Sequence, residues 1–291
     1  MKFKTIVSKL LVAAFAISTV IAVPLQRVHA DAYKVVTLGA DLTDAQKQDM
    51  LKYFGVNKNE ANVLDVNRDE EIKYLANIAS EKEIGTKSIS CSYVEPTNSG
   101  GLNISTHNIY WVSDSMIKNA LITAGIKNAN VKAAAPFNVS GTAALTGILK
   151  GFENSSAGTK IDENKKKTAN EELMVTGNLG EKIGQDKAAG LINEVKTEVV
   201  KDKPKSDEEV KKIVNDVVSG YKYKLSQDDI DKITNLMKNI NSLNLNFNDL
   251  KDQLNSVKSH LQSVLQSDEA KGFFAKLWAA ISSFFSNILS K

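Results

Sequence analysis

The sequence has few of the residue types that carry most site chemistry. Its 291 residues include one cysteine, three histidines and four prolines. A lone Cys91 excludes an internal disulfide, and its apolar neighbours Ile89 and Tyr93 predict a buried thiol in a strand. The histidines have no partner at a zinc-ligand spacing. We therefore expect no metal site and no cofactor.

A surplus of positive charge is also missing. The chain has 37 basic and 34 acidic side chains, a formal charge of +3. Four of the basic residues (Lys2, Lys4, Lys9 and Arg27) lie within the first 30 positions, so residues 31–291 carry 33 basic and 34 acidic groups. Nearly balanced charge gives no field that would concentrate phosphate polymers. Nucleic acid is therefore disfavoured as a partner.

The first 30 residues have the order of a secretory signal peptide. Three lysines precede an uncharged, mostly apolar run, Leu10–Val23, and Val28 and Ala30 provide small residues before a cleavage site. The run is shorter than the ~20 residues that a membrane-spanning helix needs. We predict export, with cleavage after Ala30, to the cell surface or the medium. An uncleaved N-terminal anchor is the alternative.

Residues 31–153 alternate between strand and helix patterns. Alternating apolar residues predict strands over 34–38, 88–95, 102–106 and 130–135. Helical spacing and end signals predict helices over 41–54, 67–84, 113–124 and 141–152. A turn-rich segment separates the strands at 88–95 and 102–106, which predicts a hairpin. This region is therefore interpreted as a mixed-sheet α/β domain.

After Asn154 the periodic segments are helical. Ser155–Gly158 and the cluster Lys165–Lys167 are typical of a linker or an exposed loop. The predicted fold class is therefore α+β, a mixed-sheet domain followed by an all-helical region. The predicted organisation is a signal peptide (1–30), a mixed α+β domain (31–153), a linker and helical connection (154–205), and a helical region (206–291) that ends in an aromatic amphipathic helix.

The last of these helices has a wide apolar stripe. Its members recur at helical spacing: Phe273, Phe274, Leu277, Trp278, Ile281, Phe284, Phe285 and Ile288. Aromatic residues on one face suit a helix at a membrane surface, or a contact with an envelope protein. The polar face has few cations, and the alternative is that the helix closes the helical bundle or docks onto the first domain.

Polar residues alternate along both strands of the expected hairpin. Ser90 and Ser92 lie on one strand, and Asn103, Ser105 and His107 on the other. If the strands pair, these side chains line a groove in which His107 lies within reach of a hydroxyl as a base. The alternatives are a solvated sheet face, or a face covered by a helix of small residues. The Gly-x-Ser-x-Gly elbow of many hydrolases is missing.

A second candidate site lies where the helix over 141–152 begins. Ser140, Gly141 and Thr142 combine free backbone N–H groups with a flexible residue, which suits an anion. The segment lacks the lysine of a phosphate-binding loop and the glycines of a dinucleotide motif. A helix cap followed by close packing on the sheet is the alternative.

Several segments, in the same order, resemble the YpuA-like family of exported bacterial proteins, a domain of unknown function. They are residues 37–46, 84–96, 119–126 and 134–147. The resemblance implies export and a shared architecture, but no activity, ligand or catalytic residue. The sequence thus favours an exported, non-enzymatic binding or structural protein that contacts a membrane surface or a partner protein. The alternative is an exported hydrolase or small-ligand binder that acts on envelope material through the 88–107 face.

Overall fold

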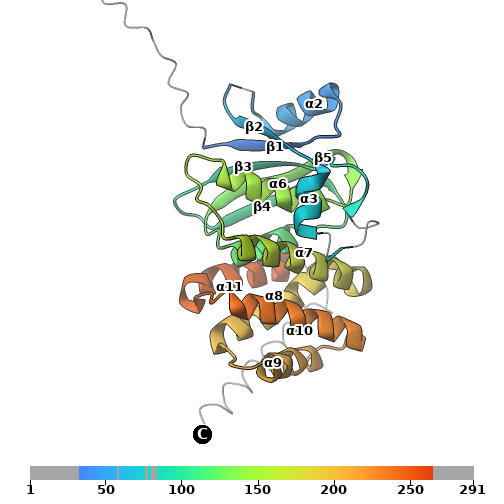
Figure 1. Cartoon of the computed structure of the whole chain (residues 1–291), viewed down its shortest axis with the longest axis vertical. Helices are drawn as coiled ribbons and strands as arrows, with labels where there is room; N and C mark the ends of the chain where they lie inside the picture. The colour runs from blue at the N-terminus through green and yellow to red at the C-terminus, as the bar shows by residue number, and fades with distance from the viewer. Residues whose placement is uncertain (1–32, 58, 76–77, 80–83, 265–291) are drawn as a thin grey trace, which may run out of the picture. The chain divides into compact units, whose positions relative to one another are not determined.

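The computed structural model describes residues 33–57, 59–75, 78–79 and 84–264 (Figure 1). Its elements are, in chain order, β1 (Val35–Gly39), α2 (Asp44–Phe54), β2 (Asn62–Val66), α3 (Arg68–Leu75), β3 (Cys91–Pro96), β4 (Leu102–Ile109), α5 (Asp114–Ala124), β5 (Ala129–Val139), α6 (Thr142–Glu153), α7 (Glu163–Ile183), α8 (Gln185–Asp202), α9 (Asp207–Ser219), α10 (Gln227–Ser242) and α11 (Phe247–Val264). The elements confirm the α+β class, because a mixed sheet is followed by helices.

The five strands form one sheet in the order β2-β1-β3-β5-β4. The pairs β1–β2 and β4–β5 are parallel, and β3 is antiparallel to both of its neighbours. The carboxyl ends of four strands therefore meet at one edge of the sheet, together with the start of β3. We call this the carboxyl edge. The helices α2, α3, α5 and α6 all begin there, because each follows one of these four strands.

The expected hairpin between β3 and β4 is wrong, because β5 lies between these strands. The crossover through α5 returns the chain and inserts β5 beside β4 in parallel. Val131, Ala133 and Ala134 on β5 are each at most 2% exposed, although they point to both faces of the sheet. Burial on both faces is typical of a central strand.

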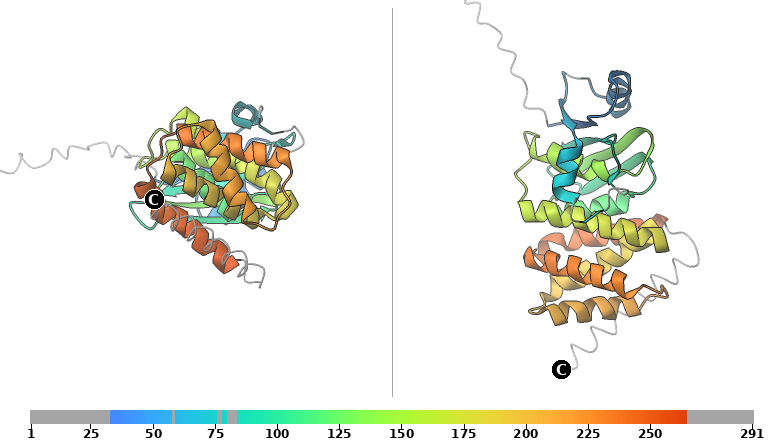
Figure 2. Two further views of the ribbon diagram at one scale, coloured as in Figure 1. Left: turned by 90° about the horizontal axis from the view of Figure 1, so that it is seen from below. Right: turned by 45° about the vertical axis from the view of Figure 1, so that its right-hand side comes forward.

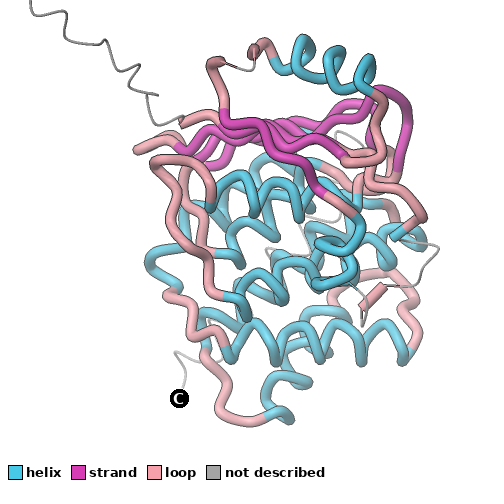
Figure 3. The backbone as a smooth tube through the Cα atoms, turned by 45° about the horizontal axis from the view of Figure 1, so that its top comes forward, coloured by secondary structure: helices cyan, strands magenta, loops and turns pink. Residues whose placement is uncertain are grey.

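The two faces of the sheet are covered very differently (Figure 3). On one face α2 is the only helix of the described residues that packs, and its core includes Met50, Leu51 and Phe54 together with Cys91 of β3. On the opposite face α5 and α6 pack first, followed by the other long helices. We call the first face the α2 face and the second the helical face. Part of the α2 face is therefore left uncovered by the helices of the described residues.

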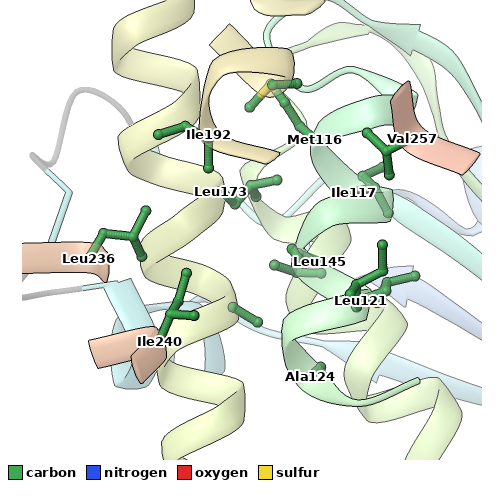
Figure 4. Packing of buried hydrophobic residues seen from close by; sticks show 14 of the residues in the cluster. Met116, Ile117, Leu121, Ala124, Leu145, Leu173, Ile192, Leu236, Ile240 and Val257 are labelled. Carbon is green, nitrogen blue, oxygen red and sulfur yellow. The ribbon is translucent and has the colours of Figure 1, made fainter. Parts of the chain in front are cut away.

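The second half of the chain stacks helices beneath the helical face (Figure 2). The helix α7 lies against α5, α8 and α10 pack against α7, and α11 packs against α5 and α8. Figure 4 shows members of this core, among them Ile117 and Leu121 of α5, Leu173 of α7, Ile192 of α8 and Ile240 of α10. The sheet and the helices thus share one hydrophobic core.

Residues 154–205, where the sequence predicted a linker and a helical connection, contain the two long helices α7 and α8. The lysines at 165–167 lie in the first turns of α7, so the expected exposed loop is wrong there. Asp162 caps this helix. Lys166 is only 6% exposed, and its ammonium bonds the Glu153 carboxylate at 3.2 Å and that of Glu163 at 2.6 Å. Two carboxylates therefore allow a lysine to be buried where a loop was expected.

Candidate functional site

Ser90 and Ser92 lie beneath α6 rather than in an open groove. Ser92 Oγ is 2.6 Å from Thr37 Oγ1, and both side chains are buried. A Cβ added to Gly147 of α6 would lie 2.4 Å from Thr37 Oγ1, so the helix is in close contact with this pair. Ser90 is also buried. These hydroxyls face a helix of small residues, as the alternative interpretation expected for part of this face.

Asn103, Ser105 and His107 lie on the opposite, α2 face of the sheet. Their partners in the register with β5 are Asn130, Lys132 and Ala134, and the three side chains are exposed. Ser92 pairs with Ala133, which points to the helical face. Successive residues of a strand point to opposite faces. The prediction that all five residues share one polar face is therefore wrong.

The structure instead brings together a polar set on the α2 face, which we call the polar sheet face: Glu95 on β3, Asn130 and Lys132 on β5, and Asn103, Ser105 and His107 on β4. Asn103 Nδ2 donates to Asn130 Oδ1 at 3.0 Å. Asn130 Nδ2 donates in turn to Glu95 Oε2 at 3.2 Å. One hydrogen-bonded row thus crosses three strands and fixes the orientation of both amides.

Aromatic rings border this face. The ring of Tyr53, from α2, stacks on the imidazole of His107 with centroids 4.8 Å apart and an interplanar angle of 17°. The Lys132 ammonium lies 5.6 Å from the centroid of the Tyr93 ring. Burial, reinforced by the neighbouring Glu95 carboxylate, raises the pKa of the Tyr93 phenol, which therefore stays a neutral donor. Tyr53 is 43% exposed, so one side of the stacked pair remains open to a ligand.

Sequence reasoning missed Tyr53, Glu95, Asn130 and Lys132 as members of this face. Asn130 and Lys132 alternate with Val131 and Ala133, a pattern that indicates one polar side of a strand. That signal was available in the sequence. No local pattern in the sequence predicts that Tyr53 joins this face, because Tyr53 lies on a helix 54 residues before His107.

Among the described residues, no hydrogen bond joins the His107 imidazole to a hydroxyl or a thiol of this face. The His107 imidazole stacks on Tyr53 and has no hydrogen-bond partner there, and the buried Ser92 lies across the sheet. Cys91 is fully buried, and burial raises the pKa of its thiol to about 11. A nucleophile needs a base within hydrogen-bond reach. These side chains form no such pair.

The second candidate site lies at the start of α6. Gly141, with φ 92°, is the N-cap, one residue later than the expected Ser140 cap, and α6 begins at Thr142. Ser140 Oγ lies 3.4 Å from Thr142 Oγ1. A Cβ on Gly141 would lie 2.4 Å from Cγ2 of Ile109, so this helix start packs tightly on the end of β4. The glycine is required by both the positive φ and the contact.

The aromatic stripe over residues 273–288 lies outside the described residues. In the part of the chain that the structure describes, no helix is long and apolar enough to cross a membrane. The described side chains also include no group of three or more His, Cys, Asp or Glu residues arranged to hold a metal ion.

Comparison with known proteins assigns the chain to a family. The family of proteins of unknown function DUF1002 matches residues 38–257, and the chain belongs to this family. The chain is also similar to the uncharacterized protein YpuA of Bacillus subtilis (strain 168), with 38% identity over 260 residues that cover 86% of this chain and 89% of that protein. No solved structure matches the chain significantly. The YpuA-like resemblance of the sequence is thereby confirmed.

Proposed function

We propose that this protein is exported and acts by binding rather than by catalysis, through the polar sheet face. The observation that carries the proposal is the hydrogen-bonded row Asn103–Asn130–Glu95 on a part of the sheet face that no helix of the described residues covers. The Tyr53–His107 stack lies further along β4 on the same face. Fixed amides on a rigid sheet bind a ligand with little loss of conformational entropy.

The ligand that this face suits best is a neutral, hydroxyl-rich glycan. Amides, a serine hydroxyl and an imidazole each offer donors or acceptors to hydroxyl groups. One lysine and one glutamate balance their charges, so the face does not select a charged polymer. The exposed Tyr53 ring adds an apolar platform of the kind that packs against the C–H face of a sugar.

Calorimetric titration with a soluble tetramer of N-acetylglucosamine tests this proposal. We expect binding by the wild-type chain and a loss of at least tenfold in affinity for Asn103→Ala, because the variant breaks the row. Asn215→Ala, which removes an exposed amide from α9, is the matched control and should bind as the wild type does. Equal affinity of wild type and Asn103→Ala would contradict the proposal, and so would an absence of binding by the wild type.

Export is supported by the basic start, the apolar run Leu10–Val23 and the small residues before the predicted cleavage site. Expression of the full chain in a Gram-positive host, followed by N-terminal sequencing of the secreted product, tests this part. We expect Asp31 to be the first residue. A product that stays in the cell with Met1 intact would contradict export.

The aromatic stripe over 273–288 supports a second contact, with a membrane surface. The support is the helical spacing of its apolar residues in the sequence. Co-sedimentation with liposomes should retain the chain, and replacing Phe273, Trp278 and Phe284 by serine should abolish retention. Retention of this variant at the wild-type level would contradict a membrane contact, and so would failure of the wild type to sediment.

A further inference from the structure

A buried carboxylate at the carboxyl edge plays no part in the polar sheet face. Glu71 lies on α3 and is 1% exposed. Its Oε1 atom has no hydrogen-bond partner among the described residues, and the same holds for the hydroxyl of the fully buried Ser88. Unpartnered buried polar atoms are costly, so such a group in a folded protein requires an explanation.

A second carboxylate is held beside this pair. The backbone N–H of Ser88 donates to Asp41 Oδ2 at 2.7 Å, and the N–H of Asp41 donates to the Ser88 carbonyl at 3.1 Å. These bonds tie the segment before β3 to the turn after β1. They also place negative charge near Glu71, which opposes its ionisation.

The other charged groups around α3 are largely engaged elsewhere. On α3 itself, Arg68 donates to the Gly85 carbonyl, and Glu70 is paired with Lys150 of α6 at 2.5 Å. From α7, Glu163 lies 3.5 Å from Lys73 and accepts from the Tyr74 hydroxyl, and Lys166 lies over the Tyr74 ring. Among the charged groups described around α3, Arg68 is the cation that lowers the pKa of Glu71.

Burial raises the pKa of Glu71 to about 7, because it outweighs the groups that lower this pKa. Ser88 and Arg68 lower the pKa, whereas Asp41 and Glu70 raise it further. A hydroxyl can donate to a carboxylate or accept from a neutral carboxyl group, so Ser88 can serve either form of Glu71. Only the neutral form avoids a buried charge, and burial therefore favours it.

We infer that Glu71 holds α3 against the carboxyl edge in its neutral, protonated form, so that α3 loosens as the pH rises toward neutrality. The helix and the edge then form a proton-sensitive latch, which is independent of ligand binding at the polar sheet face. When α3 opens, Glu71 reaches water and ionises readily. Each opening event therefore releases a proton, and higher pH favours it.

Amide hydrogen exchange in α3 tests the latch. After correction for intrinsic exchange rates, opening of α3 in the wild-type chain should increase more than tenfold between pH 5 and pH 7 and level off above pH 7. Glu71→Gln, which is always neutral, should lose this dependence. Asp69→Asn, an exposed change in the same helical turn, should keep it.

Two results would overturn the inference. One is a wild-type α3 whose opening is the same at pH 5 and pH 7, and the other is a Glu71→Gln variant with the wild-type pH dependence. If that variant fails to fold, carbon-13 NMR of the glutamate carboxyl groups in the wild-type chain decides. A Glu71 midpoint near pH 7 supports the latch, and a midpoint near the ordinary value of 4.5 refutes it.

Discussion

Lys196 Nζ lies 2.7 Å from Glu172 Oε1, and both side chains are completely buried where α5, α7 and α8 meet. The ammonium also donates to the Asn119 carbonyl at 2.9 Å and to Thr123 Oγ1 at 3.2 Å. Thr123 Oγ1 donates to Glu172 Oε2 at 2.5 Å. The ion pair is thus fully hydrogen-bonded, and it links a helix of the sheet region to the helices that follow.

Removing one partner of this pair should strongly destabilise the fold. Lys196→Met keeps the length of the side chain but leaves the Glu172 charge buried and without its cation. We expect the free energy of unfolding to fall by about 3–5 kcal/mol, measured by urea denaturation at pH 7.

The control is Lys212→Met on α9, where the pair with Asp216 is exposed and 2.8 Å long. It should change the free energy of unfolding by less than about 1 kcal/mol. Equal effects of the two substitutions would show that the buried pair has no special role.

Gly147→Ala should destabilise the protein, although alanine favours a helix. On an open helix surface this substitution stabilises by about 1 kcal/mol. Here the new Cβ would lie 2.4 Å from Thr37 Oγ1 and 3.3 Å from Ser92 Oγ. We expect a loss of about 1–3 kcal/mol in thermal or urea unfolding. A gain in stability would mean that α6 does not cover the Thr37–Ser92 pair.

Glu194 should make stability depend on pH. It is 7% exposed, and burial raises its pKa to about 7 even though the Tyr221 hydroxyl donates to it. Below pH 4.5 the group is protonated in both the folded and the unfolded states. Between pH 4.5 and 7 only the unfolded state ionises, so stability is lost as the pH rises and then levels off.

Between pH 4.5 and 7.5, ionisation of Glu194 should lower the free energy of unfolding of the wild-type chain by about 3 kcal/mol. In Glu194→Gln this contribution should be absent, which urea denaturation across the pH range would measure. Glu208→Gln, on the exposed start of α9, is the control and should leave the slope unchanged. Parallel slopes for wild type and Glu194→Gln would contradict the prediction.

The Cys91 thiol should be inert in the folded protein. It is fully buried, and burial raises its pKa to about 11, so very little thiolate is present at neutral pH. Iodoacetamide should label it only after unfolding in urea, as mass spectrometry would detect. Rapid labelling of the native chain would show that the α2 face is open at β3.

Local signals predicted most of the elements. Three of the expected helices begin at capping side chains: Thr43 at α2, Asn67 at α3 and Ser113 at α5 each accept a backbone N–H of the first turn. Short-range hydrogen bonds determine such caps, so the sequence alone indicates them. The strand β2 was not predicted, because its residues Asn62–Val66 are few and only Val66 is fully buried.

The order of the strands and the composition of the site depend on distant segments. The β4–α5–β5 crossover places β5 between β3 and β4, which no pattern within residues 88–107 indicates. Asn103, Ser105 and His107 were found by their alternation. The assignment of Ser90 and Ser92 to the same face failed, because it required a pairing that the fold does not make.

Mapping the contact of a neutral glycan on the wild-type chain tests the central claim most directly. Amide chemical shifts of the isotope-labelled protein would be recorded during titration with the N-acetylglucosamine tetramer. We predict changes at Asn103, Ser105, His107, Asn130 and Lys132, with none in α9. Shifts confined to other elements, or a spectrum unchanged at millimolar ligand, would contradict binding at the polar sheet face.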